Sequence, residues 1–481
     1  MRKYTYALAA GLVLAAGCKD ITSTEVNPVD LPTAEALTGA LTRVGLNTLA
    51  TGILAADRAT WAGVGSTYPI LANIYARDII RIDVNEPRYV NETLNGAPDP
   101  GSFAGSGGWT PNYVTIRAAN TLLQASERPD PGVFTEAELS AARGFARTMK
   151  ALAYYRAIEL RDTIGVALQL DDPGPVTPGP LICKTNGLAY VAALLDSANT
   201  DLVAGNTTPG TTRLPWTSFP TGMTAFGRNY TLISNFILFN RGIKGKVDLY
   251  RGLDHQAPNP ALFTQAITEL TQALGGTAAG AVPSSRFQTG IYHVFVPAGS
   301  EGTANPYPDI RIGINPNVTA ELQAGDARAS KFVARTTLSG FGVSVNRTYV
   351  GSVNNATNQA RPIALLRDEE LVLLRAQAYI EANQFANAIL DLNSVRTSYG
   401  LTGYTSFADK EAARTALLYE KRYSLFGEGV QRLVDLRAYG RLKEPFFTKA
   451  LPGDIFNTAF PIPKPEADAR GGVGNLTPTC S

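Results

Sequence analysis

The chain has 481 residues and a formal net charge of +2; 44% of its residues are hydrophobic and 17% are charged. This composition is typical of a globular protein with a sizeable core. The lack of clustered lysine and arginine argues against nucleic acid or an anionic surface as a partner. The 45 glycines, 30 prolines, 20 tyrosines and 19 phenylalanines indicate long loops that are rich in turns and aromatic side chains.

Residues 1–17 have the anatomy of a secretory signal, with basic Arg2 and Lys3, a largely apolar stretch and small residues before Cys18. The stretch is shorter than the ~20 apolar residues of a membrane-spanning helix, so we expect it to be cleaved. Its ending resembles the lipobox of bacterial lipoproteins, which implies that Cys18 is acylated; the alternative is an ordinary secreted protein. Several acyl chains together hold a protein firmly at a membrane. We therefore interpret residues 18–33 as a lipidated tether.

Most of the remaining chain shows apolar residues three and four positions apart, which is the spacing of a helix with one buried face. Trp61 and Trp109 lie within such patterns and are expected in the core. The clearest stripes cover residues 113–123, 145–158, 188–202, 236–250 and 263–274. These patterns predict a mainly α protein.

A pair of helices joined by a short turn is predicted near the C-terminus. Helical spacing extends over residues 371–378 and again over 385–395, and residues 381–384 supply the turn. Small Ala378 and Ala388 would let the two helices approach closely. The pair resembles a tetratricopeptide unit, which must stack on neighbouring units to bury its apolar face. We expect a tetratricopeptide-like helical-repeat body.

Long irregular segments separate the helical blocks, and loops of such length in a compact domain are usually functional or disordered. Short alternating runs between residues 294 and 350 predict a minor β-hairpin. The long segments cover residues 83–108, 171–187, 205–228 and 275–358.

Two cysteines remain once Cys18 is acylated, namely Cys183 and Cys480. An oxidising compartment would allow them to form a disulfide. Spacing alone does not show that the two sulfurs meet, so two free thiols stay as the alternative.

No motif in the chain points to catalysis, to a cofactor or to a metal. There are only two histidines, and the zinc, phosphate-loop, dinucleotide and serine-hydrolase patterns are all missing from the sequence. The acidic and basic residues of segment 417–442 are expected to form buried ion pairs at a helix junction. A glycoside hydrolase needs only two suitably spaced carboxylates, so a surface glycan-degrading hydrolase remains an alternative.

Aromatic side chains in the long loops are the candidates for ligand binding. An aromatic face together with a few hydrogen-bonding groups suits a sugar ring. Tyr89, Trp216, Tyr292 and Tyr307 lie in or beside the long loops and are the predicted ligand-binding residues. The alternative for each is that it folds down onto the helices.

Six sequence blocks occur in an order that resembles the SusD/RagB-like nutrient-binding outer-membrane lipoproteins. They include an aromatic-led helix, a long helix rich in Arg, Ala and aromatics, an Asp-x-Arg pair at Asp326 and Arg328, and three closing blocks. The blocks are residues 109–123, 142–165, 326–328, 366–401, 417–442 and 460–472.

The resemblance implies one SusD-like helical domain over residues 34–481, with an N-terminal part at 34–300 and a C-terminal part at 301–481. It also implies a surface-exposed, non-catalytic outer-membrane lipoprotein that binds an oligosaccharide or similar nutrient. Its expected partner is a TonB-dependent, SusC-like transporter, over which it acts as a lid. The same lid handling peptides in place of glycans is an alternative.

Overall fold

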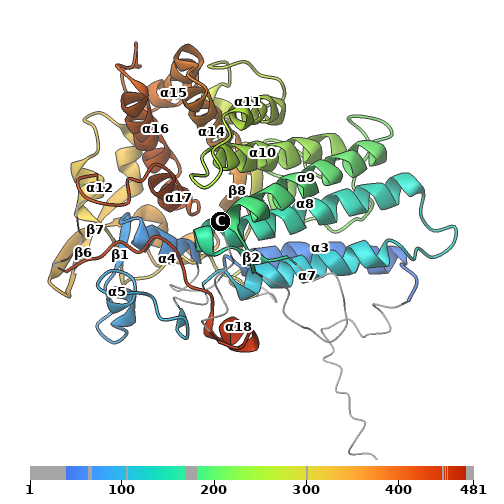
Figure 1. Ribbon diagram of the computed structural model, residues 1–481, viewed down its shortest axis with the longest axis horizontal. Coiled ribbons are helices and arrows are strands. Elements are labelled where there is room, and N and C mark those ends of the chain that lie inside the picture. The colour runs from blue at the N-terminus through green and yellow to red at the C-terminus, as the bar shows by residue number, and fades with distance from the viewer. Residues whose placement is uncertain are drawn as a thin grey trace, which may run out of the picture.

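The fold is mainly α-helical, as predicted, and is seen in a computed structural model (Figure 1). The structure describes residues 39–62, 68–103, 107–168, 181–298, 302–446, 449, 451 and 453–472. The predicted signal, the tether, Cys18 and Cys480 lie outside these residues. Within them, no helix is both long and apolar enough to cross a membrane.

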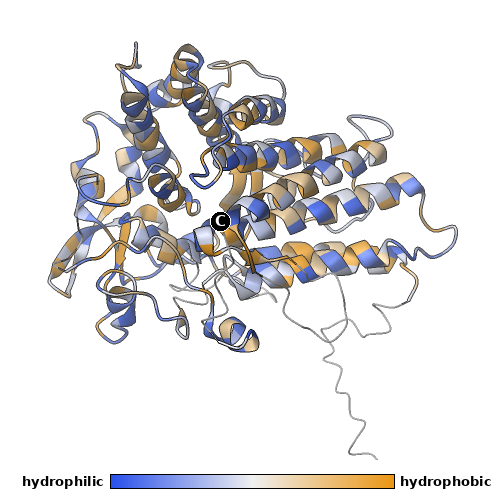
Figure 2. Cartoon of the chain, in the orientation of Figure 1, coloured by the Kyte–Doolittle hydropathy of each residue, from blue (hydrophilic) through white to orange (hydrophobic). Residues whose placement is uncertain are grey.

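Six long helices of the N-terminal part pack side by side, each against the next in chain order (Figure 1). They confirm the predicted stripes. Blue and orange alternate around these helices in Figure 2. The six helices are α3 (Arg43–Ala59), α7 (Thr110–Ala125), α8 (Glu136–Arg161), α9 (Lys184–Gly205), α10 (Ile233–Gly252) and α11 (Ala261–Ala273). Helices α3, α7, α9 and α11 bury one face each, whereas most residues of α8 and α10 are buried.

Helix α8 is the longest of these and begins with a capping box. The Thr135 side chain accepts from the backbone N–H of Glu138, whose carboxylate in turn accepts from the Thr135 N–H. Glycine permits its close contact with α9, because a Cβ at Gly144 would lie 2.7 Å from Cγ of Leu202.

The stack continues into the C-terminal part through α14 (Asp368–Glu381), on which α11 packs. The predicted helical hairpin is confirmed: α15 (Phe385–Ser398) follows α14 after a turn with Asn383 in the left-handed region, at φ 60°. Ala378 and Ala388 are both fully buried, as close approach requires. Helices α16 (Lys410–Ser424) and α17 (Gln431–Ala438) complete the array.

Within the described residues, four antiparallel strand pairs lie against the helices. The strands are β1 (Ile79–Arg81) with β5 (Ile312–Ile314), β2 (Val166–Ala167) with β3 (Leu181–Ile182), β4 (Gly290–His293) with β8 (Ile363–Arg367), and β6 (Phe332–Gly340) with β7 (Val343–Tyr349). The pair β6–β7 is the predicted minor hairpin, and β2 and β3 are also consecutive strands. The pairs β1–β5 and β4–β8 join segments that are distant in the sequence.

Short helices lie between the main elements. They are α4 (Tyr68–Tyr75), α5 (Arg88–Asn91), α12 (Pro316–Ala320), α13 (Ala356–Gln359) and α18 (Lys464–Ala469).

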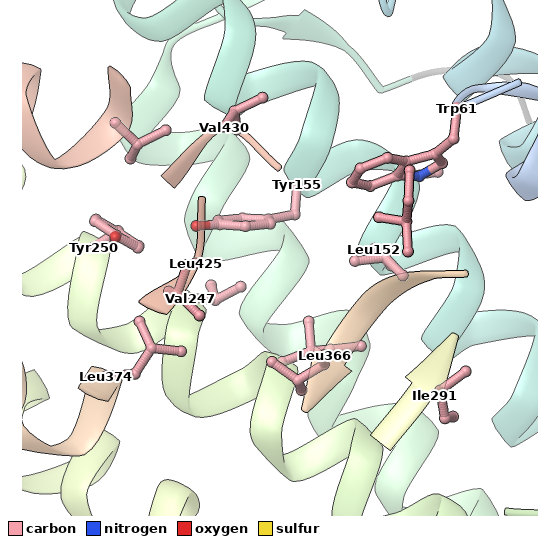
Figure 3. Close-up of a cluster of buried hydrophobic side chains, with 14 of the residues drawn as sticks. Trp61, Leu152, Tyr155, Val247, Tyr250, Ile291, Leu366, Leu374, Leu425 and Val430 are labelled. Atoms are coloured by element: carbon pink, nitrogen blue, oxygen red, sulfur yellow. The ribbon is translucent and has the colours of Figure 1, made fainter. Parts of the chain in front are cut away.

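The main core joins both parts of the chain. Figure 3 shows Tyr155 of α8 among side chains from both parts, with Val247 of α10 and Leu425 near it. Trp61 and Trp109 are buried in the same core, as predicted. Because β4 and β8 also pair across the expected boundary at residue 300, the two parts share one core.

Buried ion pairs connect the C-terminal sequence blocks. Arg328 is fully buried and pairs at 2.8 Å with both Asp326 and Glu420, while its guanidinium lies 4.8 Å from the centre of the Tyr399 ring. Although burial opposes the charged form, the two carboxylates raise the pKa of Arg328 above its usual value. The Asp-x-Arg pair therefore has an architectural role.

Candidate functional site

A cavity of about 510 Å³ opens between α3, the loop that follows Trp216, and the strand pair β4–β8. Its lining is mostly apolar with a few hydroxyl, imidazole and guanidinium groups, which is the usual character of a small-molecule site. The lining residues are Thr48, Thr51, Gly52, Leu54, Ala55, Arg58, Ser218, Phe219, Pro220, Met223, Ile291, Tyr292, His293, Val294 and Leu365.

Helix α3 forms one wall because its two faces differ. Leu46, Ala50 and Ile53 are fully buried in the core. The side that faces the cavity carries mostly small or hydroxyl-bearing residues, together with Leu54 and Arg58, and a Cβ at Gly52 would have no atom within 4 Å. The Thr42 side chain caps the helix by accepting from the Gly45 N–H at 3.0 Å. Packing on one side thus holds an open surface on the other.

The strand pair forms the second wall and is irregular there. Ile291 is opposite Leu366 and Tyr292 is opposite Ala364, so Leu365 has no counterpart on β4. Such a bulge bends a strand and re-aims its side chains, and it is common beside functional sites. It allows Leu365 to line the cavity.

The third wall is the loop over residues 217–223, which is fastened to α3 by Asn47. The Asn47 carboxamide oxygen accepts from the backbone N–H groups of Thr217, at 3.2 Å, and Ser218, at 3.0 Å. The same loop lies directly on β4 at Gly222, where a Cβ would lie 2.9 Å from the carbonyl carbon of Tyr292. The loop position therefore depends on glycine.

Two aromatic rings on the cavity lining are held from behind by other aromatics. Phe219 is half-buried and stacks on Trp216 with ring centres 5.2 Å apart. Tyr292 stacks on Phe226 with ring centres 4.1 Å apart, and its hydroxyl donates to the Gln288 carbonyl at 2.9 Å. Rings fixed in this way can meet an apolar ligand face with little loss of side-chain entropy.

A buried charged group supports the wall at His293. The Nε2 atom of His293 lies 3.0 Å from Oδ2 of Asp57, and Asp57 also forms an ion pair with Arg156. Burial raises the pKa of Asp57, but Arg156 and His293 outweigh burial and the resulting pKa is lowered. Burial lowers the pKa of His293 in spite of Asp57, so the imidazole is neutral at pH 7.

Tyr292 also borders a second, more polar cavity of about 130 Å³. Tyr307, Asn305, Arg361 and Glu428 are among its lining residues. Tyr292 is therefore the residue that the two linings share.

The four aromatic residues expected to bind ligand do not form one site. Tyr292 is on the wall of both cavities, and Tyr307 borders the smaller one, where its hydroxyl accepts from Asn73 at 3.1 Å. Trp216 is buried behind Phe219. Tyr89 is buried elsewhere, beneath Arg81, with the guanidinium 3.6 Å from its ring centre.

Sequence reasoning missed Phe219 and His293 as lining residues. Phe219 lies in one of the long loops, so the loop criterion itself could have found it. Nothing local marks His293, because its partner Asp57 is 236 positions away in the chain.

Cys183 is disulfide-bonded in the structure. Its pairing with Cys480 stays a prediction, because Cys480 lies outside the described residues. Among the residues that the structure describes, no three His, Cys, Asp or Glu side chains are grouped as a metal ion would require.

Comparisons with solved structures place this arrangement in a known class of helical-repeat folds. A SusD-like carbohydrate binding protein from Bacteroides vulgatus is 16% identical with a TM-score of 0.58, covering 82% of this chain and 83% of its own. A SusD superfamily protein from Parabacteroides distasonis is 12% identical with a TM-score of 0.65, and the match covers 89% of this chain and 98% of that protein. A laminarin binding SusD-like protein is 15% identical with a TM-score of 0.60, and the match again covers 89% of this chain and 98% of that protein. The fold is therefore that of SusD-like proteins.

The family comparison points the same way. Residues 319–464 match the model of the SusD family, and this segment contains the predicted blocks at 326–328, 366–401 and 417–442. The resemblance to the SusD/RagB-like family is thus confirmed. Comparison with curated proteins gives no match.

Proposed function

We propose that this protein binds an oligosaccharide or a similar nutrient in the cavity beside α3, without catalysis. The observation that carries the proposal is the cavity itself, whose lining combines the aromatic residues Phe219 and Tyr292 with threonine, serine and histidine residues. Sugars offer apolar ring faces and a rim of hydroxyls, and this lining can meet both. Relatives in fold include a protein described as carbohydrate binding and one described as laminarin binding.

We further propose that the protein is anchored through Cys18 to the outer membrane, exposed at the cell surface, and acts as the lid of a TonB-dependent, SusC-like transporter. The signal-like residues 1–17 and the family resemblance support this role. Of the four predicted aromatics, we retain Tyr292 as a ligand contact and assign Trp216 to the support of Phe219.

Filling the cavity tests the binding site. A Leu at Gly52 would project into open space from a helix that tolerates it well, so we expect Gly52→Leu to fold normally and to lose binding. Ala59→Leu is the matched control, because Ala59 is exposed on the same helix and does not line the cavity. Isothermal titration with laminarihexaose and maltohexaose measures the effect. Unchanged binding by Gly52→Leu would place the site elsewhere.

Fractionation tests the anchor and the partner. Cys18→Ala should move the protein from the outer-membrane fraction to the soluble fraction, since no other acylation site is expected. Purification of the wild type from native membranes in mild detergent should bring a barrel transporter with it. A Cys18→Ala protein that stays in the membrane fraction would remove the anchor from the proposal.

A further inference from the structure

The smaller cavity, of about 130 Å³, has a polar lining in which several groups are already hydrogen-bonded within the protein. The Asn305 side chain donates to the Arg361 carbonyl at 2.7 Å and accepts from the Tyr307 N–H at 2.9 Å. The Arg367 guanidinium donates to both carboxylate oxygens of Glu428, at 2.6 and 2.9 Å. These contacts fix the frame of the cavity.

Tyr349 differs from these residues, because its hydroxyl hydrogen-bonds to no group among the described residues although the side chain is only 9% exposed. Its ring lies against two glycines of the cavity lining. A Cβ would lie 2.4 Å from the ring atom Cε1 at Gly351 and 2.8 Å from it at Gly427, where it would also lie 3.2 Å from the hydroxyl oxygen. A hydroxyl buried without a partner is unfavourable, so this one can gain from a ligand.

The charged groups of the same cavity are close to the Tyr349 hydroxyl. The side chains whose charges act on its pKa are Glu428, Arg361 and Arg367, and all three residues line the cavity. Burial has the largest effect and raises the pKa of Tyr349 to about 12. The hydroxyl therefore keeps its proton at neutral pH and can donate it.

Arg361 supplies further donors beside this hydroxyl. Its Nε donates to the Asn358 side-chain oxygen at 3.0 Å, and the Asn358 amide nitrogen donates to the carbonyls of Val350 and Val353, at 2.9 and 2.8 Å. The guanidinium forms no ion pair with any residue that the structure describes. Because a guanidinium has five N–H groups, these contacts hold Arg361 in place and leave donors for a ligand.

The combination of donors with an acceptor suits hydroxyl groups better than an anion. The Glu428 side chain is 22% exposed, and each carboxylate oxygen has a lone pair beyond the one that accepts from Arg367. A sugar hydroxyl can accept a hydrogen bond from Tyr349 or Arg361 and donate another to Glu428, whereas Glu428 would repel a carboxylate or a sulfate. The volume is well below the ~300–1,000 Å³ of a site for a drug-sized ligand, so it suits a single sugar residue.

We propose that the smaller cavity binds one neutral sugar residue of the ligand through its hydroxyls, with Tyr349 and Arg361 as donors and Glu428 as acceptor. The inference rests on the proposed glycan-binding function and deepens it. It adds a second place of contact to the cavity beside α3, with which the smaller cavity shares Tyr292.

Tyr349→Phe tests the proposal, because it removes one hydroxyl and keeps the ring. Since this hydroxyl has no partner among the described residues, the free energy of unfolding in urea should be unchanged or raised. Isothermal titration with laminarihexaose or maltohexaose should show roughly tenfold weaker binding, the effect of one lost hydrogen bond. Arg361→Gln should weaken binding in the same way.

Tyr75→Phe is the matched control. Tyr75 is fully buried, its hydroxyl likewise has no hydrogen-bond partner, and it lines neither cavity. This variant should bind both hexasaccharides as the wild type does.

Wild-type affinity in Tyr349→Phe would overturn the inference, while loss of binding in Gly52→Leu would still support the cavity beside α3. A loss of stability in Tyr349→Phe would assign the hydroxyl a structural role and would also count against it. So would a hexagalacturonate that binds more tightly than the neutral hexasaccharides and loses this advantage in Arg361→Gln, because the cavity would then be an anion site. If the wild type binds neither neutral hexasaccharide, the glycan-binding function fails and the inference falls with it.

Discussion

The contact between the loop at Gly222 and strand β4 allows a sharp test of how the cavity is built. An Ala at 222 would place its Cβ 2.9 Å from the carbonyl carbon of Tyr292 and nearer still to its oxygen. Non-bonded carbons prefer about 3.5–4.0 Å, so the loop or the strand must retreat by at least roughly 0.6 Å. Both are backbone, and neither can rotate away.

We expect Gly222→Ala to lower the free energy of unfolding by about 1–3 kcal/mol, the usual cost of overpacking. Because the displaced loop carries Phe219 and the strand carries Tyr292, glycan affinity should fall as well. Urea unfolding and isothermal titration of the same preparation measure both effects. Gly52→Ala is the matched control, because it also adds a methyl group to a glycine in a wall of the cavity, at a place where no atom lies within 4 Å.

Wild-type stability together with wild-type affinity in Gly222→Ala would refute the reasoning. It would mean that the loop is not held against β4 by the close approach at this glycine. A loss of stability with unchanged affinity would keep the packing argument and remove the third wall from the site.

Three further outcomes follow from the same structure. Arg375 and Asp391 form an ion pair with both side chains fully buried, so Arg375→Met should lower the free energy of unfolding in urea by about 3–5 kcal/mol. Lys464→Ala breaks an exposed ion pair and should lower it by less than about 1 kcal/mol. Equal losses of stability in the two variants would contradict this expectation. Gly52→Ala should raise the free energy of unfolding by about 0.5–1 kcal/mol, because Gly52 lies in the middle of α3, and a lower thermal midpoint would speak against it. Burial lowers the pKa of His293 in the folded chain. Between that lowered pKa and about 6.5, the unfolded chain binds a proton at this residue that the folded chain does not bind, so the contribution of His293 to stability rises with pH. The difference in unfolding free energy between wild type and His293→Asn should therefore shrink from about pH 7.5 to about pH 5.5, and a constant difference would argue against a buried neutral imidazole.

The helical architecture could be read from the chain because its signals are local. The stripes in α7 to α11 and the hairpin of α14 and α15 depend on apolar residues three or four positions apart. This spacing of apolar residues is the same whichever element the buried face of the helix packs against. Trp61 and Trp109 are buried as expected, although Trp61 follows the end of α3 and Trp109 precedes the first residue of α7.

The binding aromatics were harder to predict, because membership of a loop does not determine the exposure of a side chain. Trp216 and Phe219 are three residues apart in one loop, yet Trp216 packs on Phe145 in the core while Phe219 reaches the cavity. Tyr89 is covered by an arginine from β1, a strand some residues earlier in the chain.

What the sequence by itself determined is the class of the fold, its order of helices and the family it resembles, all of which follow from periodicity and local motifs. Only the tertiary structure decided the site, because its three walls come from segments as far apart in the chain as α3 and β8. The bulge at Leu365, the close approach at Gly222 and the meeting of His293 with Asp57 are each properties of a pair of distant segments. A contact of that kind leaves no period in either segment, so no reading of one segment alone could reveal it.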